Sequence, residues 1–295
     1  MSREPPTASQ PVVTRFAPSP TGYLHLGHAW SALTAWSRAR EAGGRFLLRL
    51  EDIDPGRCRP EFAAGVCEDL EWLGLHWDGP ARVQSAHLDE YRQTLEQLAG
   101  RGLLYPCFCR RADIAAEIAA AGAAPHAAPD GSARYPGLCR RIDPVAARAR
   151  VEAGESHALR LDMAEACRQV GGGLSRIEDG QGAIPCRPEL FGDVVLARKD
   201  APASYHLCVT HDDARAGVTL VTRGTDLGPS TDLHRLLQAL MGWPAPVYAH
   251  HPLLRDESGR RFAKRDQALT LRALRHRGIT PEEVLERVRV MAKLA

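Results

Sequence analysis

The sequence has no apolar run of the length needed to span a membrane, which is about 20 residues. Its first ten residues are polar and lack the apolar centre of a secretory signal peptide. An excess of one charge is also missing, since 38 basic and 36 acidic residues leave a net charge of +2. These absences predict a cytoplasmic protein without a membrane partner, and any basic face for nucleic acid has to be local.

The composition is otherwise that of an ordinary globular protein, with 44% apolar and 25% charged residues. A chain of 295 residues can bury a sizeable core, either as one large domain with an insertion or as two modest domains. The eight cysteines are not explained by disulfides, because disulfides are rare in the cytoplasm. They favour a metal site instead.

The most informative stretch runs from residue 15 to residue 28 and reads RFAPSPTGYLHLGH. Pro18, Pro20 and Gly22 predict a turn, because proline fixes φ and glycine adopts backbone conformations closed to other residues. This turn separates a short apolar strand from the start of a helix.

A helix that begins near Gly27 can bind a phosphate, because its first N–H groups have no partner within the helix and lie at the positive end of the helix dipole. Gly27 has no side chain to block such a ligand. His25 and His28, three residues apart, can donate to the same phosphate. The alternative interpretation is a strand–turn–helix with two surface histidines.

Apolar residues with periods of two and of 3.6 predict strands and helices in alternation. Strands are expected at residues 12–16, 45–50, 157–161, 193–197 and 218–222. Helices are expected at residues 27–42, 60–74, 88–100 and 230–241 and from Pro281 onward. Strand, helix, strand and helix of these lengths predict an α/β fold with a parallel sheet.

Two charged residues lie where predicted strands end, which is where open α/β sheets bind ligands. Arg15 offers a guanidinium that matches a carboxylate bidentately, and Glu51 can bind an α-ammonium group. A surface ion pair is the alternative for Arg15. For Glu51 the alternative is a solvated loop in which Asp52 and Asp54 bind a metal or cap a turn.

Three cysteines, Cys107, Cys109 and Cys139, are candidate zinc ligands, since thiolates bind zinc well and a tetrahedral site needs four ligands. Ligand chemistry alone nominates His126 as the fourth. The remaining cysteines are scattered and are expected to be small buried apolar side chains. They are Cys58, Cys67, Cys167, Cys186 and Cys208.

The stretch from Pro18 to His28 resembles the HIGH region of class I aminoacyl-tRNA synthetases, and RFAPSPTG is the form found in glutamyl and glutaminyl enzymes. The resemblance extends from about Val12 to about Ala273 and implies a Rossmann-like, doubly wound catalytic core. It also implies adenylate chemistry, in which the amino acid attacks the α-phosphorus of ATP in line and pyrophosphate leaves. Mg²⁺ is expected to accompany the ATP.

The resemblance assigns residues to both substrates. L-Glutamate is expected to contact Arg15, Ala17, Ser19, Glu51, Tyr205 and Arg223. ATP is expected to contact Pro18, His25, Gly27, His28 and Lys264, with His25, His28 and Lys264 as catalytic residues. Two arginines in one pocket favour glutamate over glutamine, because an unmatched buried cation is costly.

Residues 260–265, RRFAKR, occupy the place of the family's KMSKS loop. The match is poor, because Arg261 replaces the first lysine and Ala263 replaces the serine, and only Lys264 keeps its type. Cations in this loop are expected to stabilise the charge that builds on the leaving pyrophosphate. The alternative is a basic surface patch for the RNA backbone, made by Arg260, Arg261 and Arg265.

The cysteine pattern resembles the zinc site of glutamyl-queuosine tRNA(Asp) synthetases, which implies Tyr135 as the fourth ligand. His126 or a water molecule is the alternative to Tyr135. One structural zinc ion is expected.

The resemblance also implies a division of the chain. The expected regions are a first half of the catalytic core (11–102), an inserted zinc-containing, acceptor-type subdomain (103–190), a second half of the core (191–243) and a KMSKS-like loop with a helical C-terminal segment (244–295). Only 31 residues follow Lys264, so no anticodon-binding domain is expected.

These features predict tRNA-independent, ATP-dependent activation of L-glutamate. The product is expected to be an ester on the cyclopentene-diol of queuosine in the anticodon loop of tRNA(Asp), because a cis-diol on a five-membered ring imitates the terminal ribose of tRNA. A monomer is expected. Two alternatives are a truncated glutamyl-tRNA synthetase paralogue that charges a tRNA 3′ end and a non-catalytic tRNA-binding paralogue.

Overall fold

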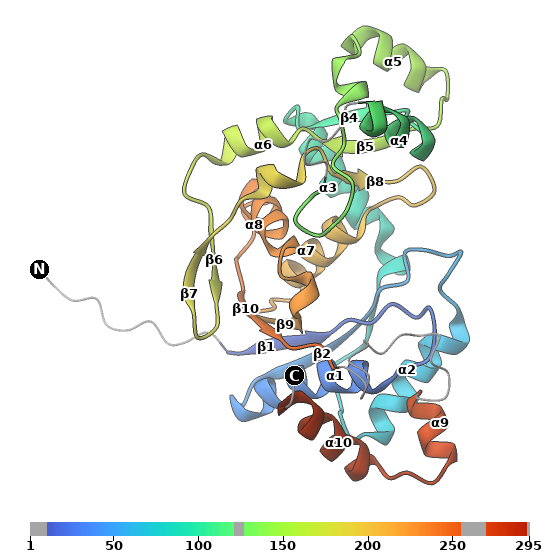
Figure 1. Cartoon of the computed structure of the whole chain (residues 1–295), viewed down its shortest axis with the longest axis vertical. Coiled ribbons are helices and arrows are strands. Elements are labelled where there is room, and N and C mark those ends of the chain that lie inside the picture. Colours follow the sequence, from blue (N-terminus) through green and yellow to red (C-terminus); the bar gives the residue numbers. More distant parts are fainter. Residues whose placement is uncertain (1–10, 121–126, 255–269, 294–295) are drawn as a thin grey trace, which may run out of the picture. The chain divides into compact units, whose positions relative to one another are not determined.

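Parallel strands form the centre of the first of two structural units in this computed structural model, which describes residues 11–120, 127–254 and 270–293 (Figure 1). Among these residues the first unit contains 11–84, 216–225, 246–254 and 270–293. Its strands are β1 (Val13–Phe16), β2 (Arg45–Leu50), β3 (Arg82–Val83), β9 (Leu220–Gly224) and β10 (Val247–His251).

The order of these strands is that of a Rossmann-like sheet. β1, β2 and β3 pair in parallel, and so do β9 and β10. The Thr219 amide donates to the Val13 carbonyl (3.0 Å), which places β9 beside β1. The order is therefore β3-β2-β1-β9-β10, in which the direction of strand addition reverses at β1, and ligands of such sheets bind at the carboxyl ends near that reversal.

Within its described residues, the same unit contains the helices α1 (Leu26–Glu41), α2 (Pro60–Trp72), α9 (Leu271–His276) and α10 (Pro281–Lys293). α1 packs against β1, β2 and β9, and α10 lies along α1 (Figure 1). Leu26 of α1, Phe46 of β2 and Val288 of α10 are fully buried in one apolar cluster. The helices predicted at 27–42, at 60–74 and from Pro281 are confirmed.

The close approach of β1 and β2 depends on Gly44. A Cβ atom at this position would lie 2.0 Å from the carbonyl oxygen of Val12, and the Arg45 amide donates to that same oxygen (2.9 Å). Any larger residue would push the two strands apart where their pairing begins.

A carboxyl group is buried in this unit without a hydrogen-bond partner among the described residues. Asp69 of α2 is 1% exposed, and neither of its carboxylate oxygens is bonded. Burial raises the pKa of Asp69 to about 7, although the nearby cation of Arg275 opposes the shift. The folded protein therefore holds this carboxyl protonated at mildly acidic pH.

Because of Asp69, the free energy of unfolding is expected to decrease as the pH rises from about 4 to about 7. In this range the unfolded chain has released the proton, while the folded chain still binds it. The full contribution is about 4 kcal/mol. Asp69→Asn does not titrate and should remove this pH dependence, whereas Glu71→Gln, an exposed change on the same helix, should keep it. Thermal unfolding midpoints at about pH 5 and about pH 8 measure both. Equal pH dependence in Asp69→Asn and the unsubstituted protein would contradict the prediction.

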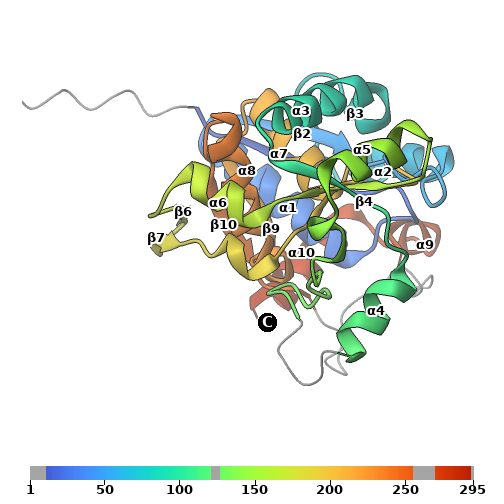
Figure 2. The same cartoon turned by 90° about the horizontal axis from the view of Figure 1, so that it is seen from above.

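The second unit contains residues 85–120, 127–215 and 226–245 of the described chain. Its antiparallel strands follow the order β4-β5-β8 (Leu104–Cys107, Ala158–Leu161, Val195–Ala197), and β6 and β7 form a hairpin (Ser175–Glu178, Gly182–Pro185). Its helices are α3 (Leu88–Gly100), α4 (Arg111–Ala120), α5 (Pro144–Glu152), α6 (Met163–Val170), α7 (Tyr205–Arg215) and α8 (Ser230–Met241). α7 packs against α3 and α8, while Figure 2 shows α4 well separated from α5.

The predicted α/β class with a Rossmann-like parallel sheet is confirmed, and the strands at 12–16 and 45–50 form as predicted. The antiparallel pairing in the second unit was not predicted. The division into regions 11–102, 103–190, 191–243 and 244–295 stays a prediction. None of the helices in the described part of the chain combines the length and the apolar character of a membrane span.

Candidate functional site

Three predicted site residues lie at the carboxyl ends of neighbouring strands in the first unit. Arg15 of β1 is 7% exposed, and its Nη1 donates to the carbonyl of Thr222 in β9 (3.1 Å). Arg223, the next residue of β9, is also buried and donates from Nε to Nε2 of His250 (3.2 Å). Glu51 follows β2 directly. The sheet therefore gathers two guanidinium groups and one carboxylate at one edge.

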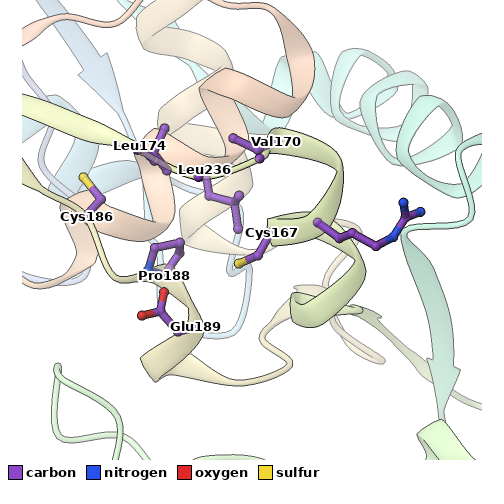
Figure 3. Close-up of a pocket in the computed structure, with 11 residues that line it drawn as sticks. Cys167, Val170, Leu174, Cys186, Pro188, Glu189 and Leu236 are labelled. Atoms are coloured by element: carbon purple, nitrogen blue, oxygen red, sulfur yellow. The ribbon is translucent and has the colours of Figure 1, made fainter.

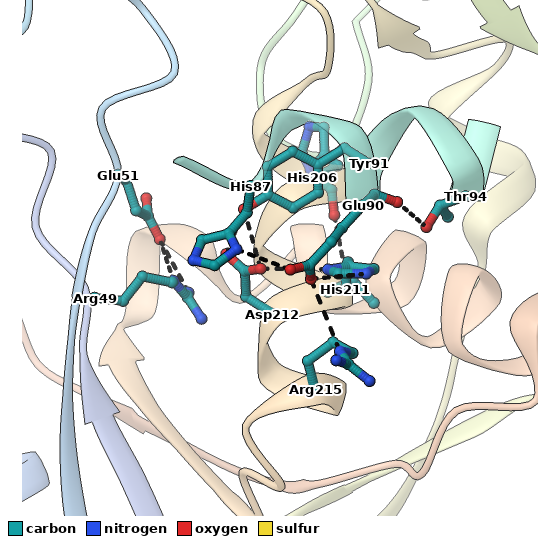
Figure 4. A network of polar contacts seen from close by, with 11 residues as sticks. Arg49, Glu51, His87, Glu90, Tyr91, Thr94, His206, His211, Asp212 and Arg215 are labelled. Atoms are coloured by element: carbon teal, nitrogen blue, oxygen red, sulfur yellow. Dashed lines mark hydrogen bonds and ion pairs between the residues drawn. The ribbon is translucent and has the colours of Figure 1, made fainter. Parts of the chain in front are cut away.

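Glu51 forms a buried ion pair with a residue that the sequence did not single out. Arg49 is 3% exposed and donates to Oε1 of Glu51 from Nη2 (3.0 Å) and from Nε (3.3 Å), as Figure 4 shows. Residues two apart on a strand point to the same face, so this spacing could have revealed the pair. A buried guanidinium stabilises the charged form of a carboxylate, which suits Glu51 to binding an ammonium group.

The loop after β1 is fixed by backbone hydrogen bonds. The Glu51 amide donates to the Pro18 carbonyl (3.0 Å), and the Thr21 amide donates to the Ser19 carbonyl (2.8 Å). Pro18 is buried, while Ala17 and Ser19 are half-buried. The loop that carries the predicted contacts to both substrates is thus tied to the end of β2.

His25 and His28 form the N-terminal cap of α1, which begins one residue before the predicted Gly27. Nδ1 of His25 accepts from the Gly27 amide (3.1 Å), and Nδ1 of His28 accepts from the His25 amide (3.2 Å). Their rings stack with centroids 3.8 Å apart. Because each Nδ1 accepts, a neutral ring carries its proton on Nε2 and can donate there to an anion.

Tyr205 belongs to the second unit, where it is the first residue of α7. Polar contacts fasten α7 to α3, as Figure 4 shows. The Tyr91 hydroxyl donates to the fully buried carboxylate of Asp212 (2.9 Å). Glu90 of α3 pairs with His211 and with Arg215 of α7 (3.8 Å each). This network fixes the helix that carries Tyr205. Apart from charged residues at helical spacing, no pattern in the sequence indicated it.

The predicted metal ligands converge in the second unit. The Sγ atoms of Cys107, Cys109 and Cys139 lie within 4.8 Å of one another. The Tyr135 hydroxyl lies 3.5 Å from Sγ of Cys107 and 3.4 Å from Sγ of Cys109. Tetrahedral zinc separates a bound oxygen from a bound sulfur by about 3.5 Å, so these positions fit one zinc ion. The cluster can hold a metal.

The thiols of this cluster differ in acidity. Burial opposes ionisation of Cys139, but hydrogen bonds, above all from Tyr135 and from the Phe108 amide (3.3 Å), hold its pKa below the usual range. Burial raises the pKa of Cys109 to about 11. Burial also raises the pKa of Tyr135 above its usual value. A bound cation would therefore have to displace protons from Cys109 and Tyr135.

Lys264, the other cations of the 260–265 loop and His126 lie outside the described residues, so their predicted roles stay predictions. Gly27 is half-buried at the start of α1.

The remaining cysteines are less buried than predicted. Only Cys208 is buried, while Cys58, Cys67, Cys167 and Cys186 are half-buried. Cys167 and Cys186 line a cavity of about 440 Å³ together with aliphatic residues such as Leu174 and Leu236 (Figure 3). Burial, with the charge of Asp232, raises the pKa of Cys186 to about 11. The thiolate, which is the nucleophilic form of cysteine, is therefore disfavoured at Cys186.

Comparison with known proteins adds a family to this geometry. Residues 11–293 match the family described as tRNA synthetases class I (E and Q), catalytic domain. The chain is 48% identical over 283 residues to a glutamyl-Q tRNA(Asp) synthetase of Rhodobacter capsulatus. The aligned region covers 92% of this chain and 98% of the relative. It is 43% identical over 282 residues to a glutamyl-Q tRNA(Asp) synthetase of Symbiobacterium thermophilum, which covers 92% of this chain and 83% of the relative.

The fold is similar to a crystal structure of a glutamate tRNA ligase from Elizabethkingia meningosepticum in complex with its amino acid, with a TM-score of 0.73 and 30% identity. The similarity covers 87% of this chain and 52% of that one, so this chain spans about half of the ligase. The strand-end residues and the histidine cap lie within the region that matches this family. The chain belongs to the catalytic-domain family of class I tRNA synthetases of the E and Q type and, within it, to the glutamyl-Q tRNA(Asp) synthetases.

Proposed function

We propose that this protein activates L-glutamate with ATP, without tRNA, and transfers it to the cyclopentene-diol of queuosine in the anticodon loop of tRNA(Asp). The observation that carries the proposal is the group of Arg15, Arg223 and the Arg49-held carboxylate of Glu51 at one edge of the sheet. Two cations and one anion there match the charges of glutamate. The names of the relatives, glutamyl-Q tRNA(Asp) synthetase, supply the acceptor.

In the first step an oxygen of the glutamate α-carboxylate attacks the α-phosphorus of ATP, and pyrophosphate leaves with the electrons of the broken P–O bond. Glu51 accepts hydrogen bonds from the α-ammonium group. Arg15, Arg223 and Tyr205 recognise carboxylate oxygens, with Ala17 and Ser19 beside them. Positioning and charge stabilisation supply the rate enhancement, because no side-chain nucleophile is required.

The ATP phosphates are bound at the start of α1. Nε2 of His25 and of His28 donates to phosphate oxygens, and the absence of a side chain at Gly27 lets the phosphates approach the first N–H groups of the helix. Lys264 neutralises the pyrophosphate, and Mg²⁺ accompanies the nucleotide.

In the second step a hydroxyl of the queuosine diol attacks the activated carbonyl carbon. AMP leaves, the hydroxyl proton passes to solvent, and an ester forms. Zinc, held by Cys107, Cys109, Cys139 and Tyr135, would support the fold of the second unit without touching the reacting atoms.

The protein acts in the cytoplasm as a monomer.

The proposal predicts that transfer depends on queuosine. The protein is incubated with labelled glutamate, ATP and tRNA(Asp) with or without queuosine, and the label is mapped. Label is expected in the anticodon loop of queuosine-containing tRNA only, at least about 100-fold above the other RNA, because without the diol there is no nucleophile. The ester should be labile in mild alkali.

Two outcomes would overturn the acceptor. Label on the 3′-terminal adenosine would favour a glutamyl-tRNA synthetase paralogue. Equal labelling of both RNAs would exclude queuosine as the nucleophile. A protein that exchanges no pyrophosphate at all would instead be a non-catalytic tRNA-binding paralogue.

A further inference from the structure

A cavity of about 520 Å³ lies in the first unit beside the histidine cap, apart from the strand-end residues. It is lined by the loop Thr21–Tyr23, by Phe62 of α2 and by Thr270, Arg272 and His276. Its volume lies within the range of roughly 300–1,000 Å³ that is typical of sites for small ligands. Nothing in the predicted glutamate or ATP contacts uses these residues.

Two aromatic rings form one wall of this cavity, which we name the Tyr23 pocket. Tyr23 and Phe62 meet edge to face, with ring centroids 5.0 Å apart, and both are half-buried. The Tyr23 ring rests on Gly65, where an added Cβ would approach it to 3.0 Å. The two rings therefore form an apolar wall, and because they stand nearly perpendicular, a flat ligand can stack on one ring at a time.

Positive charge lies directly beside this aromatic wall. Arg272 is exposed and donates from Nη1 to the Tyr23 hydroxyl (2.6 Å), with its guanidinium carbon 4.9 Å from the centre of the Tyr23 ring. Within the described residues no carboxylate forms a salt bridge with Arg272, although its charge slightly lowers the pKa of buried Asp69. A guanidinium has five N–H donors, so most of those of Arg272 remain for a ligand. His276 is exposed at the same cavity.

The Tyr23 pocket is joined to the cap of α1 by main-chain contacts. The Leu271 amide donates to the Leu24 carbonyl (2.8 Å), and Thr270 forms a β-bridge with His25. The residues on either side of these contacts are Tyr23 and Arg272, which line the pocket. Tyr23, which lines the pocket, precedes His25 by only two positions, and we assign His25 to the ATP phosphates.

We propose that the Tyr23 pocket binds an unpaired nucleotide of the RNA acceptor, with its base against Tyr23 and Phe62 and its phosphate at Arg272 and His276. The inference rests on the proposed function, which makes an RNA loop the acceptor. Proteins bind unpaired bases by stacking them on aromatic rings and neutralise the adjoining phosphate with arginine. The pocket supplies both, and RNA is the polyanion that this reaction requires.

The test compares two substitutions that remove the same charge from one segment. Arg272→Gln lies in the pocket, whereas Arg277→Gln, exposed at the end of α9, lies outside it. Binding of queuosine-containing tRNA(Asp) is measured by fluorescence anisotropy at several salt concentrations, without ATP or glutamate. Arg272→Gln should weaken binding by about 5- to 20-fold and reduce the slope of log K against log salt by about 1. Arg277→Gln should change the affinity less than twofold, roughly.

Phe62→Leu tests the stacking wall, and it should weaken binding by about 5- to 150-fold without changing the salt slope. Its thermal unfolding midpoint is measured in parallel, and Arg272→Gln, an exposed change, serves if Phe62→Leu does not fold. Unchanged tRNA binding in both variants would overturn the proposal. So would loss of AMP binding in Arg272→Gln with tRNA binding intact, because the pocket would then take a free nucleotide.

Failure of the pocket and failure of the proposed function give different results. The binding measurement needs no catalysis, so it tests the pocket even if glutamate-dependent pyrophosphate exchange is absent. If the protein exchanges pyrophosphate but the pocket variants bind tRNA as tightly as the unsubstituted protein, the proposed function stands and the proposed RNA-binding role of the pocket is excluded.

Discussion

Glu51→Gln is expected to reduce glutamate-dependent pyrophosphate exchange by about 30-fold to several-thousand-fold, which corresponds to about 2–5 kcal/mol. The substitution keeps the shape of the side chain but removes the anion that binds the α-ammonium group. It also removes the negative charge that faces the buried guanidinium of Arg49, which adds to the cost. The unsubstituted protein should exchange pyrophosphate without any tRNA.

The measurement is pyrophosphate exchange over a range of glutamate concentrations, together with the thermal unfolding midpoint. Glu41→Gln, an exposed change at the end of α1, is the matched control and should leave exchange within about twofold. Arg223→Ala should lower exchange to a similar extent as Glu51→Gln, since it removes a buried cation from the same edge of the sheet. Exchange at the unsubstituted rate in Glu51→Gln would exclude this carboxylate as the amino-group partner.

Cys107→Ser is expected to lower the zinc content from about one ion per chain to almost none and to destabilise the second unit by about 4 kcal/mol or more. Cys107 is 1% exposed, and its thiol is one of three that lie within 4.8 Å of one another. Loss of one thiolate would leave the cluster with too few ligands to hold the ion. Transfer to RNA should suffer more than activation, because the proposed ion would support the second unit and not the strand-end residues of the first.

Zinc is measured by elemental analysis of protein purified without chelator, and stability by thermal unfolding with and without added zinc. Cys167→Ser, a half-buried cysteine of the same unit outside the cluster, is the control and should retain the ion. An unsubstituted protein free of metal would refute the site. Tyr135→Phe with full zinc content would refute only Tyr135 as the fourth ligand and would favour water or His126.

Much of the first unit could be predicted because its signals are local. The strand at 45–50 and the helix begun by Pro281 form at the residues that periodicity and proline placement indicated. The turn with Pro18 and the adjacent histidines was recognised from a contiguous stretch of fourteen residues, 15–28. Because the carboxyl ends of parallel strands lie at one edge of the sheet, the placement of Arg15 and Glu51 at the same edge also followed from their positions at strand ends.

Other features could not be read in this way because they join residues that are far apart in the chain. The contact of Tyr91 with Asp212 spans 121 positions, and nothing near either residue indicates the other. The burial of Asp69 is likewise invisible to helical periodicity, which places a charged residue on the solvent side. The Tyr23 pocket brings together Phe62 and Arg272, which belong to two helices that the sequence does not link.

By itself, the sequence determined the α/β class, the strand ends that carry the charged residues, the histidine pair at a helix start and the cysteines of the metal cluster. The first three follow from neighbouring residues, since backbone propensity and side-chain period act over a few positions, whereas the cysteines were selected by their ligand chemistry. Only the tertiary structure decided that Arg49 holds Glu51, that α7 is fastened to α3 through Asp212, and that an aromatic and cationic cavity adjoins His25. These depend on which surfaces pack together, and packing is chosen by the whole chain through the burial of apolar area and the pairing of buried charges.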